Sequence, residues 1–101
     1  MTDLPDVVRT DSQFEIRLGD AVAFAQYRVK GDSIIFPHTV VPDAFAGQGV
    51  GKRLVEAGLA YAKAQNLLVR PHCSFFKAYI AKRPELHAMV HPDERATLTP
   101  A

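Results

Sequence analysis

The chain has 101 residues, of which 48% are hydrophobic and 23% are charged, and its formal net charge at pH 7 is +1. These values are typical of one soluble globular domain with a single core. They offer no broad basic surface for nucleic acid, and the apolar runs are too short to span a bilayer. The single cysteine excludes an internal disulfide and fits a reducing compartment. We therefore expect a cytoplasmic protein without nucleic-acid or membrane partners and, since no Cys/His cluster has zinc spacing, without a metal site.

Alternating apolar and polar residues predict three antiparallel strands in the first half of the chain, and glycine–aspartate pairs predict tight turns between them. The strands and turns span 14–18, 19–20, 21–30, 31–32 and 33–41. Pro37 indicates a bulge or bend inside the third strand, because proline cannot donate to a strand ladder.

Three glycines in five residues separate the third strand from a long amphipathic helix. Gly47, Gly49 and Gly51 lie where this helix begins, and a residue without a Cβ lets an anion approach the backbone. The first N–H groups of a helix lack intrahelical partners, and the helix dipole adds about half a positive charge there. The segment is therefore typical of a phosphate-binding loop. A glycine-rich connection without a ligand is the alternative.

Two common nucleotide-binding motifs do not fit this loop. A Walker A loop needs Ser or Thr after Gly-Lys, whereas Gly51-Lys52 is followed by Arg53. A Rossmann fingerprint needs Gly-x-Gly-x-x-Gly and an acidic residue about 20 positions further on. The glycine spacing differs, and residues 57–84 contain neither Asp nor Glu. Both motifs are excluded.

The second half of the chain predicts a helix, a strand and a second helix. The first helix starts near Val50, and Asn66 suits a left-handed cap at its end. A helical crossover makes the next strand, 67–72, parallel to the strand before the loop. Ser74 is expected to cap the last helix, and Pro84 to end it.

The chain is expected to consist of three parts. Residues 1–10 include Asp3, Pro5, Asp6 and Arg9, which is unlike a signal peptide, and they predict a flexible N-terminus. Residues 11–87 contain all the predicted strands and helices and form a compact domain. Residues 88–101 show little periodicity and predict a disordered tail.

The loop resembles the acyl-CoA pyrophosphate loop of the GNAT acetyltransferase superfamily, Gln/Arg-x-x-Gly-x-Gly/Ala, with Gly49 and Gly51 at its last two positions. The segments His38-Thr39-Val40-Val41-Pro42 and Pro71 to Ile80 resemble the short, single-domain YjdJ-type branch. The resemblance covers residues 14 to about 87. It implies an α+β, sandwich-like fold with a mixed, mostly antiparallel sheet, in the order strand-strand-strand-helix-strand-helix. This is a truncated GNAT fold, which lacks the usual N-terminal pair of helices.

The resemblance implies acetyl-CoA as the acyl donor and an amine, on a small molecule or on a protein lysine or N-terminus, as the acceptor. It places Thr39, Val40 and Val41 along the pantetheine arm. The residues that it places on the pyrophosphate are Ala46, Gly47, Gln48, Gly49, Val50, Gly51 and Lys52. Ala46 departs from the Gln or Arg of the family motif, so backbone N–H groups, Gln48, Lys52 or Arg53 have to supply that contact.

Cys73 is the candidate nucleophile. It precedes the last helix, and a helix N-terminus favours a thiolate, which can form an acyl intermediate. The resemblance places it beside the CoA thiol. Packing, or lining of the acyl pocket, explains a free cysteine equally simply.

His38, with His72 as a second choice, is the candidate general base, because an imidazole exchanges protons near neutral pH. Strand periodicity places His38 on the apolar face of Ile34 and Phe36, so a core histidine is the alternative. The resemblance makes Tyr79 the acid that protonates the CoA thiolate, although Tyr79 also falls on the apolar stripe of its helix.

The sequence therefore predicts an acetyl-CoA-dependent N-acetyltransferase. Two alternatives stay open, a non-catalytic acyl-CoA-binding module and an interaction domain that keeps the fold without the ligand. The acceptor, the acyl chain and the oligomeric state do not follow from the sequence. Direct transfer to the amine is preferred over an acetyl-cysteine intermediate.

Overall fold

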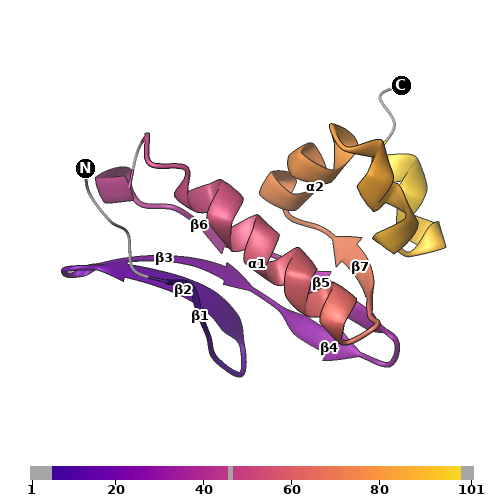
Figure 1. The fold of residues 1–101 in the computed structure, drawn as a ribbon, viewed down its shortest axis with the longest axis horizontal. Coiled ribbons are helices and arrows are strands. Elements are labelled where there is room, and N and C mark those ends of the chain that lie inside the picture. The colour runs from indigo at the N-terminus through magenta and orange to yellow at the C-terminus, as the bar shows by residue number, and fades with distance from the viewer. Residues whose placement is uncertain (1–5, 46, 99–101) are drawn as a thin grey trace.

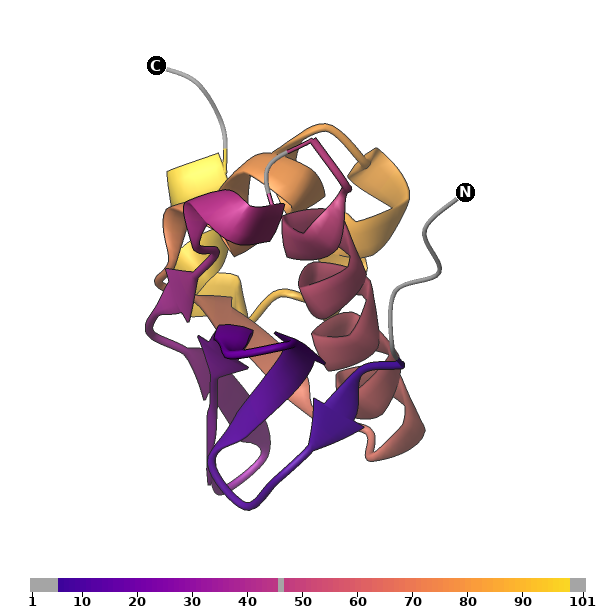
Figure 2. The ribbon, with the colours of Figure 1, turned by 90° about the vertical axis from the view of Figure 1, so that its left-hand side faces the viewer.

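The computed structural model describes residues 6–45 and 47–98, which form a mixed α+β fold. The strands are β1 (Val8–Arg9), β2 (Gln13–Leu18), β3 (Ala21–Gln26), β4 (Arg28–Lys30), β5 (Ser33–Phe36), β6 (Thr39–Val40) and β7 (Leu68–Pro71). The helices are α1 (Val50–Ala64), α2 (Ser74–Ala81) and the 3-10 helices η1 (Asp43–Phe45), η2 (Pro84–Met89) and η3 (Pro92–Leu98). Figures 1 and 2 show α1 and α2 on one side of the strands. The element order and the mostly antiparallel pairing confirm the predicted fold class.

The strands form two sheets because two of the predicted long strands are interrupted. The strand predicted over 21–30 breaks at Tyr27, whose N–H donates to the carbonyl of Ser12 at 2.9 Å. The strand predicted over 33–41 breaks at Pro37 and His38, as expected from the proline. One sheet has the order β1-β2-β3-β6 and the other β4-β5-β7. Consecutive strands β5 and β6 therefore belong to different sheets.

This division separates β6 from β7. Strand β5 pairs in parallel with β7, as predicted, and the last pair in the register is Phe36 with Pro71. Strand β6 pairs instead with β3 in antiparallel register. The edges of β6 and β7 therefore diverge beyond Phe36, and residues at this point lie between the two sheets.

The core lies between α1, α2 and the strands. Phe36 from β5 and Phe76 from α2 are fully buried, and their rings stack with centroids 4.0 Å apart. Gly58 lets α1 approach this pair, since a Cβ there would come within 2.8 Å of the Phe36 ring. A larger residue at 58 would therefore push α1 away from the sheet.

The end of α1 follows the prediction. Asn66 has a φ of 56°, and the N–H of Leu67 donates to the carbonyl of Ala62 at 2.8 Å. This pattern is a Schellman motif with asparagine in the left-handed position. Among the described helices, none is long and apolar enough to cross a membrane.

Both ends of the chain differ from the predicted flexible segments where the structure describes them. Strand β1 pairs with β2, and η2 and η3 fold back against α2. Val90, between these two helices, is fully buried and forms a parallel bridge with Val69 of β7. The His91 N–H also donates to the Val69 carbonyl at 2.9 Å. This bond and the burial of Val90 attach the C-terminal segment to β7, although its sequence has little periodicity. Residues 1–5 and 99–101 lie outside the described residues, and the domain boundaries at 11 and 87 stay a prediction.

Candidate functional site

The glycine loop forms an open turn at the start of α1. Gly47 and Gly49 have positive φ values of 76° and 69°, and Gly49 is the N-cap of α1. A Cβ at either position would meet nothing within 4 Å, so the space beside the backbone is free. Ala46, the residue that departs from the motif, lies outside the described residues.

The first backbone N–H groups of α1 have no partner within the helix. The N–H of Arg53 donates to Gly49 at 3.1 Å and so begins the helical series. The N–H groups of Val50, Gly51 and Lys52 precede that bond and have no intrahelical carbonyl to pair with. The loop thus supplies three adjacent donors at the positive end of a helix of 15 residues.

Side chains of the loop contribute unequally. The Gln48 amide donates to the Ala44 carbonyl at 3.2 Å and so closes the turn. Lys52 is exposed and is one of the residues that line the cavity between α1 and α2. Lys52 therefore fits the role of an anion contact better than Gln48.

A cavity of about 280 Å³ lies between α1 and α2 next to the loop. Its walls include apolar and aromatic side chains and three cations. The lining residues are Gly51, Lys52, Val55, Phe75, Ala78, Tyr79, Lys82 and Arg83. A cleft with this lining suits a long, partly apolar ligand with phosphate groups at one end.

Phe75 occupies the space that Gly51 leaves free. A Cβ on Gly51 would lie 2.6 Å from the Phe75 ring, and the Phe75 residue is still 43% exposed. Gly51 therefore has a second role that the sequence did not indicate, because it leaves room for an aromatic ring that lines the cavity.

Cys73 and Thr39 meet where the two sheets diverge. The Cys73 thiol donates to the Thr39 hydroxyl at 3.0 Å, and the Cys73 N–H donates to the Phe36 carbonyl at 3.0 Å. Cys73 is only 7% exposed. It is also the N-cap of α2, so the prediction that Ser74 caps this helix is wrong: Ser74 is its first helical residue. The structure thus joins two predicted site residues from distant parts of the chain.

His38 lies in the break between β5 and β6 and is exposed. The prediction that it shares the apolar face of Ile34 and Phe36 is wrong, because the interruption after Phe36 ends the strand alternation. Its carbonyl accepts from the Gln26 N–H at 2.8 Å and so joins β3 to the start of β6. The exposure of His38 removes the core-histidine alternative, and its role as a base stays a prediction.

Tyr79 faces α1 and not Cys73. Its hydroxyl donates to the Glu56 carboxylate at 3.1 Å, and the Arg83 guanidinium lies over its ring at 3.7 Å. Burial, reinforced by the bond to Glu56, raises the pKa of Tyr79 above its ordinary value. The phenol is protonated at neutral pH, as a tyrosine of ordinary pKa also is, and it lines the cavity beside Lys52.

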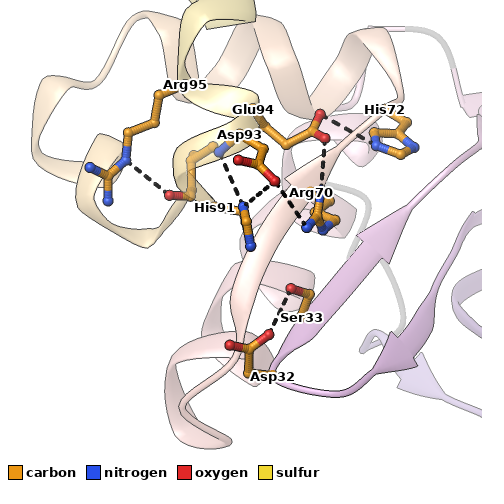
Figure 3. Close-up of polar contacts among 9 residues, drawn as sticks. Asp32, Ser33, Arg70, His72, His91, Asp93, Glu94 and Arg95 are labelled. Carbon is orange, nitrogen blue, oxygen red and sulfur yellow. Dashed lines mark hydrogen bonds and ion pairs between the residues drawn. The ribbon is translucent and has the colours of Figure 1, made fainter.

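A polar cluster on the other side of α2 was not predicted as a unit. Figure 3 shows that Arg70 of β7 and His72, which follows β7, meet acidic residues of η3. Glu94 lies 3.1 Å from Arg70 and 3.3 Å from His72, and Asp93 lies 3.8 Å from Arg70 and 3.6 Å from His91. The spacing of 24 positions between Arg70 and Glu94 gives no local signal, so the sequence alone could not pair them. Within the described residues no group of three or more His, Cys, Asp or Glu could hold a metal ion.

Comparison with known proteins identifies one family and several relatives of this chain. Residues 13–89 match the family model described as GCN5-related N-acetyl-transferase. The chain is 31% identical to Protein NATD1 of Xenopus tropicalis over 80 residues, which cover 75% of this chain and 72% of that protein. It is 32% identical to Protein NATD1 of Mus musculus and of Homo sapiens over 79 residues, covering 75% of this chain and 72% and 70% of those proteins.

Proposed function

This chain belongs to the GCN5-related N-acetyltransferase family, and we propose that it binds acetyl-CoA and transfers the acetyl group to an amine in the cytoplasm. The observation that carries the proposal is the open glycine loop at the start of α1, next to a cavity that leads along α2. A phosphate-binding loop alone would fit many ligands. The adjoining cavity and the divergent edges of β6 and β7 favour a ligand with a long arm.

The residues present fit the donor. The pyrophosphate would lie against the N–H groups of 50–52, where a Cβ at Gly49 would face open space and where Lys52 adds a cation. The pantetheine arm would follow Thr39, Val40 and Val41, whose edge is not covered by β7. Phosphate contacts from backbone N–H groups need no side chain, so Ala46 does not prevent binding.

Acetyl-CoA, when bound, supplies the acetyl group as a thioester. The amine acceptor has to lose a proton before its nitrogen bonds to the acetyl carbon, and the carbon–sulfur bond then breaks. We assign His38, which is exposed at the strand break, as one candidate for the proton acceptor. The proposal that Tyr79 donates the proton that the leaving sulfur takes rests on the family resemblance, and it requires the hydroxyl to leave Glu56, to which it donates in this structure.

Cys73 is proposed to line the acyl end of the site. Its thiol already donates to Thr39, and its burial leaves direct transfer to the amine as the simpler route. In the alternative route, the Cys73 sulfur would bond to the acetyl carbon first and pass the group to the amine in a second step.

Intact mass spectrometry and turnover together test the proposal. The protein is mixed with acetyl-CoA and then with spermidine, lysine methyl ester or a lysine-containing peptide, and release of free CoA is followed. We expect acetylated amine and no stable protein adduct. An adduct of about 42 Da that Cys73→Ala abolishes would establish the acetyl-cysteine route instead. Binding without turnover of any of these amines would support the non-catalytic acyl-CoA-binding alternative.

A further inference from the structure

We propose that Glu94 of η3 positions His72 as the general base for the amine acceptor, on the face of the β4-β5-β7 sheet opposite α1. This inference rests on the proposed acetyl transfer. It assigns the proton acceptor to His72, whose imidazole contacts the Glu94 carboxylate. Glu94 acts through His72 and is a positioning residue, whereas His72 touches the acceptor.

His72 has the right place for this role. It follows the last residue of β7 and directly precedes Cys73, so their Cα atoms are about 3.8 Å apart. The His72 N–H donates to the Arg70 carbonyl at 3.1 Å, so the chain turns at the end of β7. Cys73 is buried on the side of Thr39, whereas the His72 side chain is 46% exposed. The imidazole therefore reaches solvent beside the point where the two sheets diverge.

Glu94 contacts the His72 imidazole and lies beyond the residues that match the family model. Its Oε1 lies 3.3 Å from His72 Nε2 and its Oε2 lies 3.1 Å from Arg70, and its side chain is 17% exposed (Figure 3). The match to the family model ends at residue 89. The segment from Val90 to Arg95 lies beyond the matched residues and places a carboxylate next to His72.

A second cavity adjoins this pair. It has a volume of about 340 Å³ and is lined by Lys30, Asp32, Ser33, Ile35, Arg70 and His72. Ile35 alternates with the buried Ile34 and Phe36 of the same strand, so this cavity lies on the face away from α1. The donor cavity between α1 and α2 and this second cavity thus lie on opposite sides of the strands, with His72 and Cys73 between them.

The charges around His72 fit proton transfer. An ammonium group entering the cavity gives one proton to the imidazole and becomes the free amine that bonds to the acetyl carbon. The imidazolium that forms is stabilised by the nearby Glu94 carboxylate, in the way that a carboxylate supports histidine in other acyl-transfer sites. The other charged groups on this side are Lys30 of β4, Asp32 of the turn, Arg70 of β7 and His91 and Asp93 before and within η3.

Glu94→Gln tests the pair, with Asp93→Asn as the matched control because both acids contact Arg70 and only Glu94 contacts His72. Acetylation is measured with the most reactive of spermidine, lysine methyl ester and the lysine peptide. Glu94→Gln and His72→Gln should lower kcat by about 10²- to 10⁴-fold, with the thermal shift from acetyl-CoA retained. In both variants the KM for acetyl-CoA should stay unchanged, because the step that is lost is proton transfer and not donor binding. Asp93→Asn should keep kcat.

Each other outcome is informative. If Glu94→Gln and Asp93→Asn lower the melting temperature equally and leave kcat unchanged, Glu94 only fastens η3 and the inference is overturned while the transferase proposal stands. If the parent protein binds acetyl-CoA and acetylates none of the three amines, the transferase proposal fails, and the base with it. If His38→Gln abolishes turnover and His72→Gln does not, the base is His38.

Discussion

The two ends of the candidate site are built in different ways. The glycine loop depends on residues within a few positions of one another: two positive φ values, a turn closed by Gln48, and a helix start at Gly49. The acyl end depends on residues far apart in the sequence, since Cys73 reaches Thr39 over 34 positions and Arg70 reaches Glu94 over 24. The first region is specified by backbone conformation, and the second by the way the sheets divide.

Because of this difference, substitutions in the two regions should have different effects on ligand binding and on stability. A single side chain at a loop glycine should abolish ligand binding and leave the fold, because strain stays local. A change at the acyl end should alter packing between elements and affect stability and chemistry together.

The largest expected effect is the loss of ligand binding in Gly49→Val. Acetyl-CoA at a hundredfold excess over Kd should stabilise the parent protein by about 2.7 kcal/mol, which is roughly 10 °C in melting temperature for a domain of this size. A β-branched residue at a φ of 69° distorts the loop and covers its N–H groups. Differential scanning fluorimetry should therefore show no shift for this variant.

Gly31→Val is the matched control for the loop. Gly31 has a φ of 61° and free space beside it, as Gly49 has, but it lies in the turn between β4 and β5. Both variants should lose similar stability, and Gly31→Val should keep the shift with acetyl-CoA. Loss of the shift in both would mean that strain in general, and not the loop, weakens binding.

The second effect concerns the C-terminal segment. Val90→Ala removes two methyl groups from a fully buried side chain and should lower the free energy of unfolding by roughly 1 to 3 kcal/mol. Val29→Ala, at a residue that is 50% exposed, should have little effect. Urea denaturation measures both, and equal effects would show that residues 88–98 behave as a loose tail after all.

The contrast between the two regions also explains what the sequence could predict. The loop, the helix of 50–64, the left-handed Asn66 and the parallel strand all follow from local patterns, and the structure has them. The family resemblance is likewise confirmed.

Predictions at the acyl end were weaker because they needed tertiary contacts. The exposure of His38 depends on how β5 and β6 separate after Pro37, and alternation along one strand cannot report that separation. The cap of α2 is Cys73 because the Cys73 N–H bonds to Phe36 across the sheet. The pairing of Glu94 with His72 depends on a buried valine in a segment without periodicity.

An effect of similar size is expected at Gly51, which contacts Phe75 of α2. Gly51→Ala places a Cβ 2.6 Å from the Phe75 ring and should cost roughly 1 to 3 kcal/mol through overpacking. In a Phe75→Ala background the same change should stabilise α1 by up to about 1 kcal/mol, the ordinary preference of alanine over glycine in a helix. A double-mutant cycle measured by urea denaturation should show this reversal of sign. Additive effects would mean that Gly51 and Phe75 do not interact energetically.

The smallest effect is a pH dependence from Tyr79. The folded state raises the pKa of Tyr79, so its contribution to stability is complete below the unfolded value of about 10. That contribution is lost as the pH rises through the higher folded value. Tyr79→Phe should therefore flatten the decline of the free energy of unfolding above about pH 10. If the decline is the same in Tyr79→Phe, titratable groups other than Tyr79 cause the loss of stability at alkaline pH.

Native mass spectrometry of the protein with acetyl-CoA tests the central claim most directly. The account predicts a complex of one protein chain with one acetyl-CoA, which Gly49→Val abolishes and Gly31→Val retains. No complex at millimolar acetyl-CoA, or a complex that survives equally in Gly49→Val, would contradict it.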